Sequence, residues 1–258
     1  MHRFFVTLAS RSNRDVTVTG DIAHQIARVL RLRANEDVIL IPADGVDAVE
    51  WWVRLVSVEA RTVRGEIIAD RPCLPEPTCA VILCAALLKG DRFDWLLQKA
   101  TELGAAAIQP VVTAHTIRKI GSDDGRAVER WQRIVTEAAE QSGRGHVPEM
   151  RGPVSLGALA GAVAVPLFVA HETVAARTLV DALPARANRI AVVIGPEGGF
   201  RDDEVALLVA DAGAVPVSLG PRILRAETAA ITAVTLVMAQ TGNLAPPRER
   251  AWRDIRDI

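Results

Sequence analysis

The feature that most constrains the fold of this chain is an alternation of short apolar runs with amphipathic helical patterns, which extends from residue 80 to residue 240. Continuous apolar runs of this length are typical of strands that are covered on both faces of a sheet. They predict strands at 80–87, 106–113, 165–170, 189–195 and 214–220. Apolar residues at helical spacing predict helices at 91–104, 126–143, 174–183, 201–212 and 225–240. Strands that alternate with helices indicate an α/β fold with a mostly parallel sheet.

The first 72 residues have a different pattern, which predicts a small β-rich unit. Strands are expected at 38–41, 51–58 and 63–68, separated by polar turns. Three prolines within residues 70–78 disfavour regular structure, so we expect a linker there. One helix is expected at 21–33, with Asp21 as its N-cap and an apolar face made of Ile22, Ile26 and Val29.

Composition excludes several classes of function. The formal net charge of −1 argues against a globally basic nucleic-acid binder. The apolar runs are too short to span a bilayer and the N-terminus does not resemble a signal peptide, so we expect a cytoplasmic protein without a membrane partner. The chain has three cysteines without a CxxC pair, which argues against a disulfide framework or a metal site and favours buried thiols at Cys73, Cys79 and Cys84.

Three loops that directly follow predicted strands are the candidate binding segments, because ligands of open parallel sheets bind at the carboxyl ends of the strands. They are 170–173, 195–200 and 219–229, and the last two are rich in glycine. Phosphate-binding fingerprints are missing, since the sequence has neither GxxxxGK[ST] nor GxGxxG after a strand. A plain turn is one interpretation of each loop. The other is that backbone groups unobstructed by a Cβ grip a small ligand.

Charged residues open the last predicted helix. Glu227 in a first turn interacts favourably with the helix dipole, whereas Arg225 does not. Arg225 is therefore either a solvated surface residue or the contact for an anionic partner. His171 and Glu172 follow a strand, but the sequence has no nucleophile elbow beside them, so we expect a structural role for His171.

The motifs in the two glycine-rich loops resemble those of a known protein family. "IGPEGGF" (194–200) followed by "LGPRILRAETA" (219–229) resembles the SPOUT-type RNA methyltransferases. More narrowly it is similar to the RsmE family, which methylates N3 of a uridine in small-subunit ribosomal RNA. "LLKGDRFDWLLQKATELG" (87–104), "EAAEQSGR" (137–144) and the N-terminal His24 with Arg28–Arg33 match in the same order. The resemblance covers nearly the whole chain.

The resemblance implies an architecture that the hydrophobic periodicity of the sequence cannot predict. Residues 1–72 would form a PUA-like RNA-binding β-barrel, and residues 73–245 a SPOUT α/β domain with a deep trefoil knot. Residues 246–258 match nothing we recognise and are expected to be a C-terminal tail. The enzyme would be a homodimer, its site would lie near the subunit boundary, and its partner would be 16S ribosomal RNA or the small ribosomal subunit.

The resemblance also implies where S-adenosyl-L-methionine binds. The cofactor would be held in the knot, with its adenine against backbone groups of 194–199 and 219–224. The expected cofactor-binding residues are Ala170, Glu172, Ile194, Gly195, Pro196, Glu197, Gly198, Gly199, Leu219, Gly220, Ile223, Leu224, Arg225, Thr228 and Ala229.

Catalytic and RNA-binding roles follow from the same resemblance. The guanidinium of Arg225 would stabilise the imide anion that forms when uridine N3 loses its proton. Glu227 would orient Arg225 or accept that proton, and Glu197 is the alternative base. Arg28 and Arg31 would share a helical face for RNA. The remaining candidates for RNA contacts are Arg33, Arg3, His24 and Arg144.

Three other interpretations remain open. A different SPOUT activity, such as methylation of a tRNA ribose or guanine, has the same cofactor loops. A non-catalytic RNA-binding module would keep a degenerate pocket, although the intact glycine loops and Arg225 argue against it. A nucleotide-dependent oxidoreductase is disfavoured by the missing fingerprint.

Overall fold

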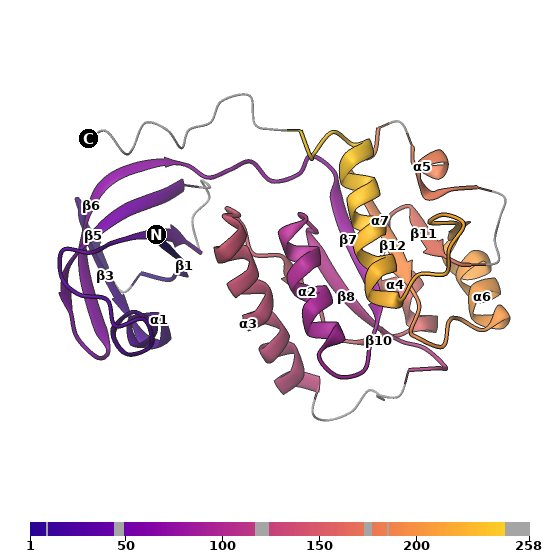
Figure 1. Cartoon of the computed structure of the whole chain (residues 1–258), viewed down its shortest axis with the longest axis horizontal. Coiled ribbons are helices and arrows are strands. Elements are labelled where there is room, and N and C mark those ends of the chain that lie inside the picture. The colour runs from indigo at the N-terminus through magenta and orange to yellow at the C-terminus, as the bar shows by residue number, and fades with distance from the viewer. Residues whose placement is uncertain (9, 44–48, 117–123, 173–176, 185, 246–258) are drawn as a thin grey trace.

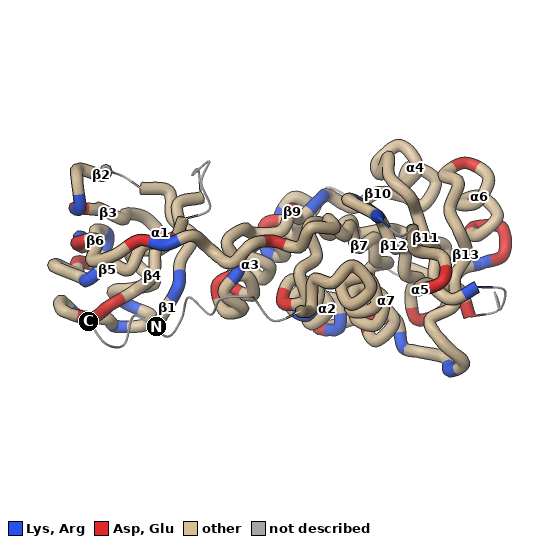
Figure 2. Tube along the Cα trace, turned by 90° about the horizontal axis from the view of Figure 1, so that it is seen from above, with Lys and Arg blue, Asp and Glu red and all other residues tan. Residues whose placement is uncertain are grey.

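The structure is a computed structural model that describes residues 1–258 apart from 9, 44–48, 117–123, 173–176, 185 and 246–258. The expected C-terminal tail therefore lies outside the described residues. Figure 1 shows a β-rich N-terminal unit beside an α/β unit, and Figure 2 shows helix α3 (Asp124–Ser142) on the side of the α/β unit that faces the β-rich one. Within the described residues, no helix is long and apolar enough to cross a membrane.

The N-terminal unit is a six-stranded sheet in the order β1-β4-β5-β6-β3-β2. Its pairs are antiparallel except for β1 with β4, and Phe4, Leu40 and Leu55 are buried in its core. The pairings among the described residues run from one edge to the other without closing a barrel. The strands are β1 (His2–Val6), β2 (Ser10–Ser12), β3 (Asp15–Thr19), β4 (Asp37–Pro42), β5 (Val49–Val58) and β6 (Thr62–Pro72).

The predicted N-terminal helix is shorter than expected and differently capped. Helix α1 (Gly20–His24) has Thr19, not Asp21, as its N-cap, and it continues as a π-helical turn only to Val29. Arg31 has a φ of 56°, in the left-handed region, so it lies past the helix and does not share a helical face with Arg28. The prediction that Val29 belongs to the apolar face is also wrong, because Val29 is 65% exposed.

The linker expected at 70–78 begins later than the prolines suggested. Strand β6 runs to Pro72, which pairs with Val49 at the end of the sheet, so residues 70–72 are strand and not linker. A proline is tolerated there because β3 pairs with β6 only as far as Glu66, so one side of β6 is an edge at Pro72. Residues 73–79 then lead to the second sheet, with a bridge from Leu74 to Arg144.

The second sheet confirms the predicted α/β fold, because its pairings are all parallel. Its strand order is β10-β8-β7-β12-β11-β13, with β9 paired to β8. The strands are β7 (Ala80–Ala86), β8 (Ala107–Val112), β9 (Glu149–Met150), β10 (Val154–Ser155), β11 (Leu167–Ala170), β12 (Arg189–Ile194) and β13 (Val215–Val217).

Helices cover both faces of this sheet, which is why its strands are apolar on both sides. One face buries Val81, Leu83 and Val192 against α2 (Arg92–Glu102), α3, α5 (Leu179–Ala182) and α7 (Ala226–Gln240). The other face buries Ile82 and Val193 against α4 (Leu159–Ala162), α6 (Asp202–Ala212) and the short 3-10 turn Leu156–Ala158. Figure 1 shows α2, α3 and α7 side by side over the sheet.

Candidate active site

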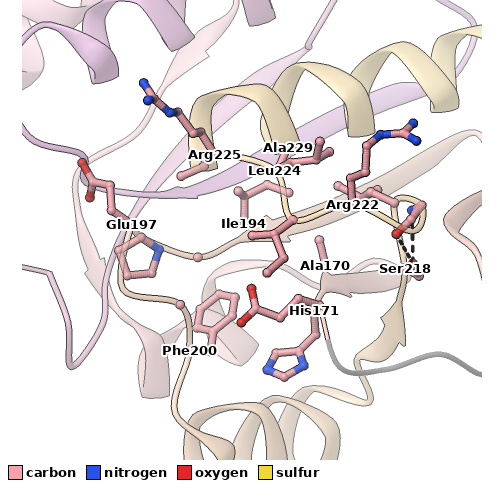
Figure 3. Close-up of a pocket in the computed structure, with 18 of the residues that line it drawn as sticks. Ala170, His171, Ile194, Glu197, Phe200, Ser218, Arg222, Leu224, Arg225 and Ala229 are labelled. Atoms are coloured by element: carbon pink, nitrogen blue, oxygen red, sulfur yellow. Dashed lines mark hydrogen bonds between the residues drawn. The ribbon is translucent and has the colours of Figure 1, made fainter.

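A cavity of about 850 Å³ opens at the carboxyl ends of β11, β12 and β13. The three loops that follow these strands line it together, as the sequence predicted, and Figure 3 shows their side chains around one space. The lining comes from 170–172, 194–197, 199–200 and 218–226, with Arg92, Thr178 and Ala229 completing it. The strands place these loops together because parallel neighbours end at the same edge of the sheet.

Most of the expected cofactor residues do line this cavity. Gly198 and Thr228 are the exceptions, because Gly198 turns its carbonyl toward His115 and Thr228 is exposed on the first turn of α7. The lining residues that the sequence predicted are Ala170, Glu172, Ile194, Gly195, Pro196, Glu197, Gly199, Leu219, Gly220, Ile223, Leu224, Arg225 and Ala229.

Several lining residues were not named individually as cofactor-binding residues, although some lie in the predicted binding loops. Phe200 closes one quoted motif and Arg92 lies inside another, so both could have been found from the motifs that contain them. His171 lines the cavity although we expected only a structural role, and its backbone N–H donates to the carbonyl of Val217 at 3.0 Å. The others are Thr178, Ser218, Pro221, Arg222 and Ala226.

Glycine is favoured at two positions of the turn after β12. A Cβ on Gly195 would lie 3.0 Å from the ring of Phe200, tighter than ordinary contact, so glycine lets that ring pack against the backbone. Gly199 has a φ of +71° and donates its N–H to the carbonyl of Pro196 at 2.9 Å. The turn therefore brings backbone, unobstructed by side chains, to the cavity wall.

The second glycine loop is held by a local hydrogen bond. The hydroxyl of Ser218 accepts from the N–H of Gly220 at 3.1 Å, and Gly220 has a φ of +127° that other residues rarely adopt. The loop then passes through Leu224 to Arg225, which is the N-cap of α7 in extended conformation. Arg225 is exposed, and Figure 3 shows it on the same side of the pocket as Glu197.

The two predicted carboxylates have different surroundings. Glu197 lines the cavity, where its carboxylate accepts from the N–H of Lys89 at 3.2 Å and pairs with Arg92 at 3.3 Å. Glu227 does not line the cavity, and its Oε2 is buried without a hydrogen-bond partner in the described part of the chain. Of the three catalytic candidates, Arg225 and Glu197 share the cavity.

The expected RNA-binding residues separate into exposed and buried ones. His24, Arg28, Arg31 and Arg33 are exposed on the N-terminal unit, where a nucleic acid could reach them. Arg3 is buried and paired with Glu50, which also pairs with Arg71. This ion-pair cluster is internal, so the prediction that Arg3 contacts RNA is wrong.

Arg144 is likewise structural. It is 8% exposed, and its guanidinium donates to the carbonyls of Thr101 at 3.0 Å and Ala105 at 2.7 Å and pairs with Glu76. These are backbone acceptors at the end of α2 and a carboxylate of the connecting segment. The guanidinium is turned inward, so the prediction of an RNA contact at Arg144 is wrong.

The cysteines are buried thiols, as predicted. Burial raises the pKa of Cys73 to about 11 and that of Cys84 to about 12, so neither is a thiolate near neutral pH. Among the described residues, no group of three or more His, Cys, Asp or Glu side chains is arranged to hold a metal ion.

Known proteins similar to this chain provide evidence that is independent of the cavity. Residues 75–238 match the family model described as an RNA methyltransferase domain. Among curated proteins, the chain is 38% identical over 235 residues to ribosomal RNA small subunit methyltransferase E of Synechocystis, covering 89% of this chain and 73% of that protein. It is 33% identical to the Bacillus subtilis protein of the same name, covering 93% of this chain and 97% of the other.

Solved structures agree with these relatives. A methyltransferase from Legionella pneumophila with the cofactor SAM bound superposes with a TM-score of 0.82 at 31% identity, covering 92% of this chain and 96% of that one. Ribosomal RNA small subunit methyltransferase E from Neisseria gonorrhoeae, bound to S-adenosyl methionine, gives a TM-score of 0.81 at 29% identity, covering 93% of this chain and 97% of the other.

Proposed function

This chain belongs to the ribosomal RNA small subunit methyltransferase E family, and from that premise we propose that it methylates N3 of a uridine in 16S ribosomal RNA. It is a ribosomal RNA methyltransferase that uses S-adenosylmethionine. The observation that carries the choice of reaction is the position of Arg225, an exposed guanidinium at the rim of a cavity whose wall is glycine-rich backbone.

The residues of the cavity fit S-adenosylmethionine. Ile194, Leu219 and Leu224 offer apolar surface for an adenine ring, and the turns around Gly195 and Gly220 leave backbone N–H and C=O groups accessible. We propose that backbone of 194–199 and 219–224 holds the cofactor. When bound, it supplies the electrophilic methyl group.

Uridine N3 must lose its imide proton before it can attack a methyl group. The charge that develops spreads over O2, N3 and O4, so a planar guanidinium beside one of these oxygens stabilises it. Arg225 has this role in our proposal. Glu197 accepts the proton, since it lies in the same cavity and its position is held by Lys89 and Arg92. Glu227, outside the lining, serves only the first turn of α7.

We propose that two copies of the chain associate through α7. This helix is mostly apolar, as in "AAITAVTLVMA", and its Ile231 and Leu236 are only half-buried. Beside it, Ile223 is 83% exposed and Leu244 is 50% exposed. A second copy over this surface would bury it, and would bring a subunit boundary close to Arg225. Sedimentation equilibrium measures this directly, with a monomer at micromolar concentration as the contrary result.

We also propose a trefoil knot in the α/β unit and a PUA-like fold for the N-terminal unit. β13 lies at the sheet edge beside β11, whereas α7 packs on β7 and β12, so residues 218–225 must cross the ends of two strands. This crossing supports a deep trefoil knot in 73–245. The sheet of residues 1–72 with exposed His24, Arg28, Arg31 and Arg33 supports a PUA-like RNA-binding unit, and a ribosomal substrate implies a cytoplasmic location.

Mass spectrometry of ribosomal RNA from a strain without the gene tests the reaction. We expect one uridine of 16S RNA to lose a base methyl group, and purified protein with S-adenosylmethionine to restore it on isolated RNA or on small subunits. Restoration on only one of these substrates identifies which one the enzyme uses. A methyl group missing instead from a tRNA ribose or guanine supports the other SPOUT activities. An unchanged methylation pattern supports a non-catalytic module.

A further inference from the structure

We propose that His115, which does not line the cavity, is a positioning residue that holds the cofactor-binding turn Pro196–Gly199 in shape. This inference rests on the proposed function, because it concerns the same cavity. His115 follows β8, two strands away from β12 in the sheet, so nothing in the local sequence connects it with the glycine turn.

The contact is a shared hydrogen bond. Nδ1 of His115 lies 3.0 Å from the carbonyl oxygen of Gly198 and 3.1 Å from that of Gly199. Both partners can only accept, so Nδ1 must carry the proton, and either the Nδ1–H tautomer or the imidazolium satisfies this. One side chain thus fixes two consecutive peptide planes of the turn.

The close approach explains a glycine that does not line the cavity. A Cβ on Gly198 would lie 3.2 Å from the Cβ of His115, closer than ordinary van der Waals contact. Pro196, Glu197 and Gly199 line the cavity, while the carbonyls of 198 and 199 face His115. The turn is therefore gripped from the side that a ligand does not occupy.

A second contact makes the support for His115 rigid. Glu204 is 9% exposed, and its carboxylate accepts from the N–H of Ala114 at 2.7 Å and from the N–H of Arg201 at 3.0 Å. It thereby joins the residue before His115 to the start of α6. Within the His115 loop, the hydroxyl of Thr116 accepts from the N–H of Thr113 at 3.0 Å.

The turn is consequently tied on two sides, by His115 after β8 and by Lys89 and Arg92 after β7 through Glu197. A turn that is already ordered binds its ligand without the cost of fixing it at that moment. Loss of the histidine bond leaves the pocket chemistry intact and loosens the backbone that forms its wall. The deficit should therefore appear in cofactor affinity and not in the chemical step.

The experiment compares His115→Ala and His115→Asn, with His146→Ala as the control at another exposed histidine of the same unit. The Asn amide can donate from close to the position of Nδ1, so it should rescue. We expect His115→Ala to weaken binding of S-adenosylmethionine by about tenfold in calorimetry, and His115→Asn to stay within about threefold of wild type. Turnover at saturating cofactor should hardly change, while KM for the cofactor rises.

Hydrogen exchange of the cofactor-free protein provides a readout independent of catalysis. The amide of Gly199, bonded to Pro196, should exchange about tenfold faster in His115→Ala and normally in His115→Asn and His146→Ala. Wild-type affinity and exchange in His115→Ala would overturn the proposal, as would an equal defect in His115→Asn. If wild-type protein does not bind the cofactor, the assigned activity fails, but the exchange result still decides the role of His115.

Discussion

The guanidinium of Arg92 lies 3.3 Å from the carboxylate of Glu197, and the two residues follow β7 and β12, which are neighbouring strands of the sheet. The backbone N–H of Lys89 donates to the same carboxylate. An acidic side chain in the cavity is therefore held in one place before any substrate arrives. Charged groups that the fold holds in place before the reaction usually make the largest single contribution to stabilising a transition state.

Replacing Glu197 by Gln tests whether it accepts the proton of uridine N3. The amide keeps the size and the acceptor for Lys89 but cannot take a proton, so turnover should fall by about 10²-fold or more. Cofactor affinity, measured by calorimetry, should stay within a few-fold. The companion variant Glu227→Gln should retain near-normal turnover, and the reverse ranking of the two variants would transfer the base role to Glu227.

Arg225→Ala should leave cofactor binding nearly unchanged and lower turnover by about 10²-fold or more, because it removes the donors that stabilise the imide anion. Single-turnover methylation at saturating cofactor and RNA is the measurement. Arg133→Ala, at an exposed arginine on α3, is the matched control. A variant that methylates at the normal rate shows that Arg225 has no part in the chemical step.

Arg144→Ala should destabilise the protein without a direct effect on RNA affinity. The change removes hydrogen bonds to Thr101 and Ala105 and leaves Glu76 without this ion pair, at a cost of about 3 kcal/mol. Urea unfolding gives the free energy of unfolding, and filter binding gives the RNA affinity. Normal stability together with weaker RNA binding is the result that would restore the original interpretation of Arg144.

The double variant Arg28→Ala and Arg33→Ala should weaken RNA binding without lowering stability, which is the opposite of the result expected for Arg144→Ala. Both side chains are exposed, so stability should change little. RNA binding should weaken, and the slope of log affinity against log salt should become shallower by about 1 for each phosphate that the double variant no longer neutralises. Binding whose strength and salt slope both match wild type places the RNA elsewhere.

Glu140 predicts a pH dependence of stability at the contact between the two units. Its carboxylate accepts from the N–H of Phe5, but burial raises its pKa to about 7, and neighbouring Glu137 adds to that effect while Arg3 opposes it. The folded state thus binds a proton more tightly than the unfolded chain. The resulting stabilisation is complete below about pH 4.5 and is lost as the pH rises through about 7.

Glu140→Gln should remove that pH dependence, because an amide accepts from Phe5 without ionising. Urea unfolding from pH 5 to 8, roughly the range that spans the raised pKa, should show wild type losing on the order of 1 kcal/mol relative to the variant. Parallel pH profiles for the two proteins would mean that Glu140 keeps an ordinary pKa. The position of the midpoint tests the direction of the shift directly.

The sequence by itself predicted the strands of the α/β unit, because a strand that is covered on both faces of a sheet has a continuous apolar sequence. The run at 80–87 became β7 (Ala80–Ala86), and the run at 189–195 became β12 (Arg189–Ile194), each within a residue. Parallel pairing then required the loops after β11, β12 and β13 to meet. The motifs in those loops indicated the family. The family in turn implied the cofactor and most of the residues that line the cavity.

Tertiary structure alone decided what depends on partners distant in the chain. Arg144 and Arg3 have the chemistry of RNA-binding residues, yet carboxylates and carbonyls far along the sequence turn both inward. Arg31 left the helical face because the chain bends at a left-handed residue. His115 meets Gly198 although β7 lies between the strands that precede them. A side chain's chemistry is local, but whether it faces water, backbone or ligand is set by which segments the fold brings beside it.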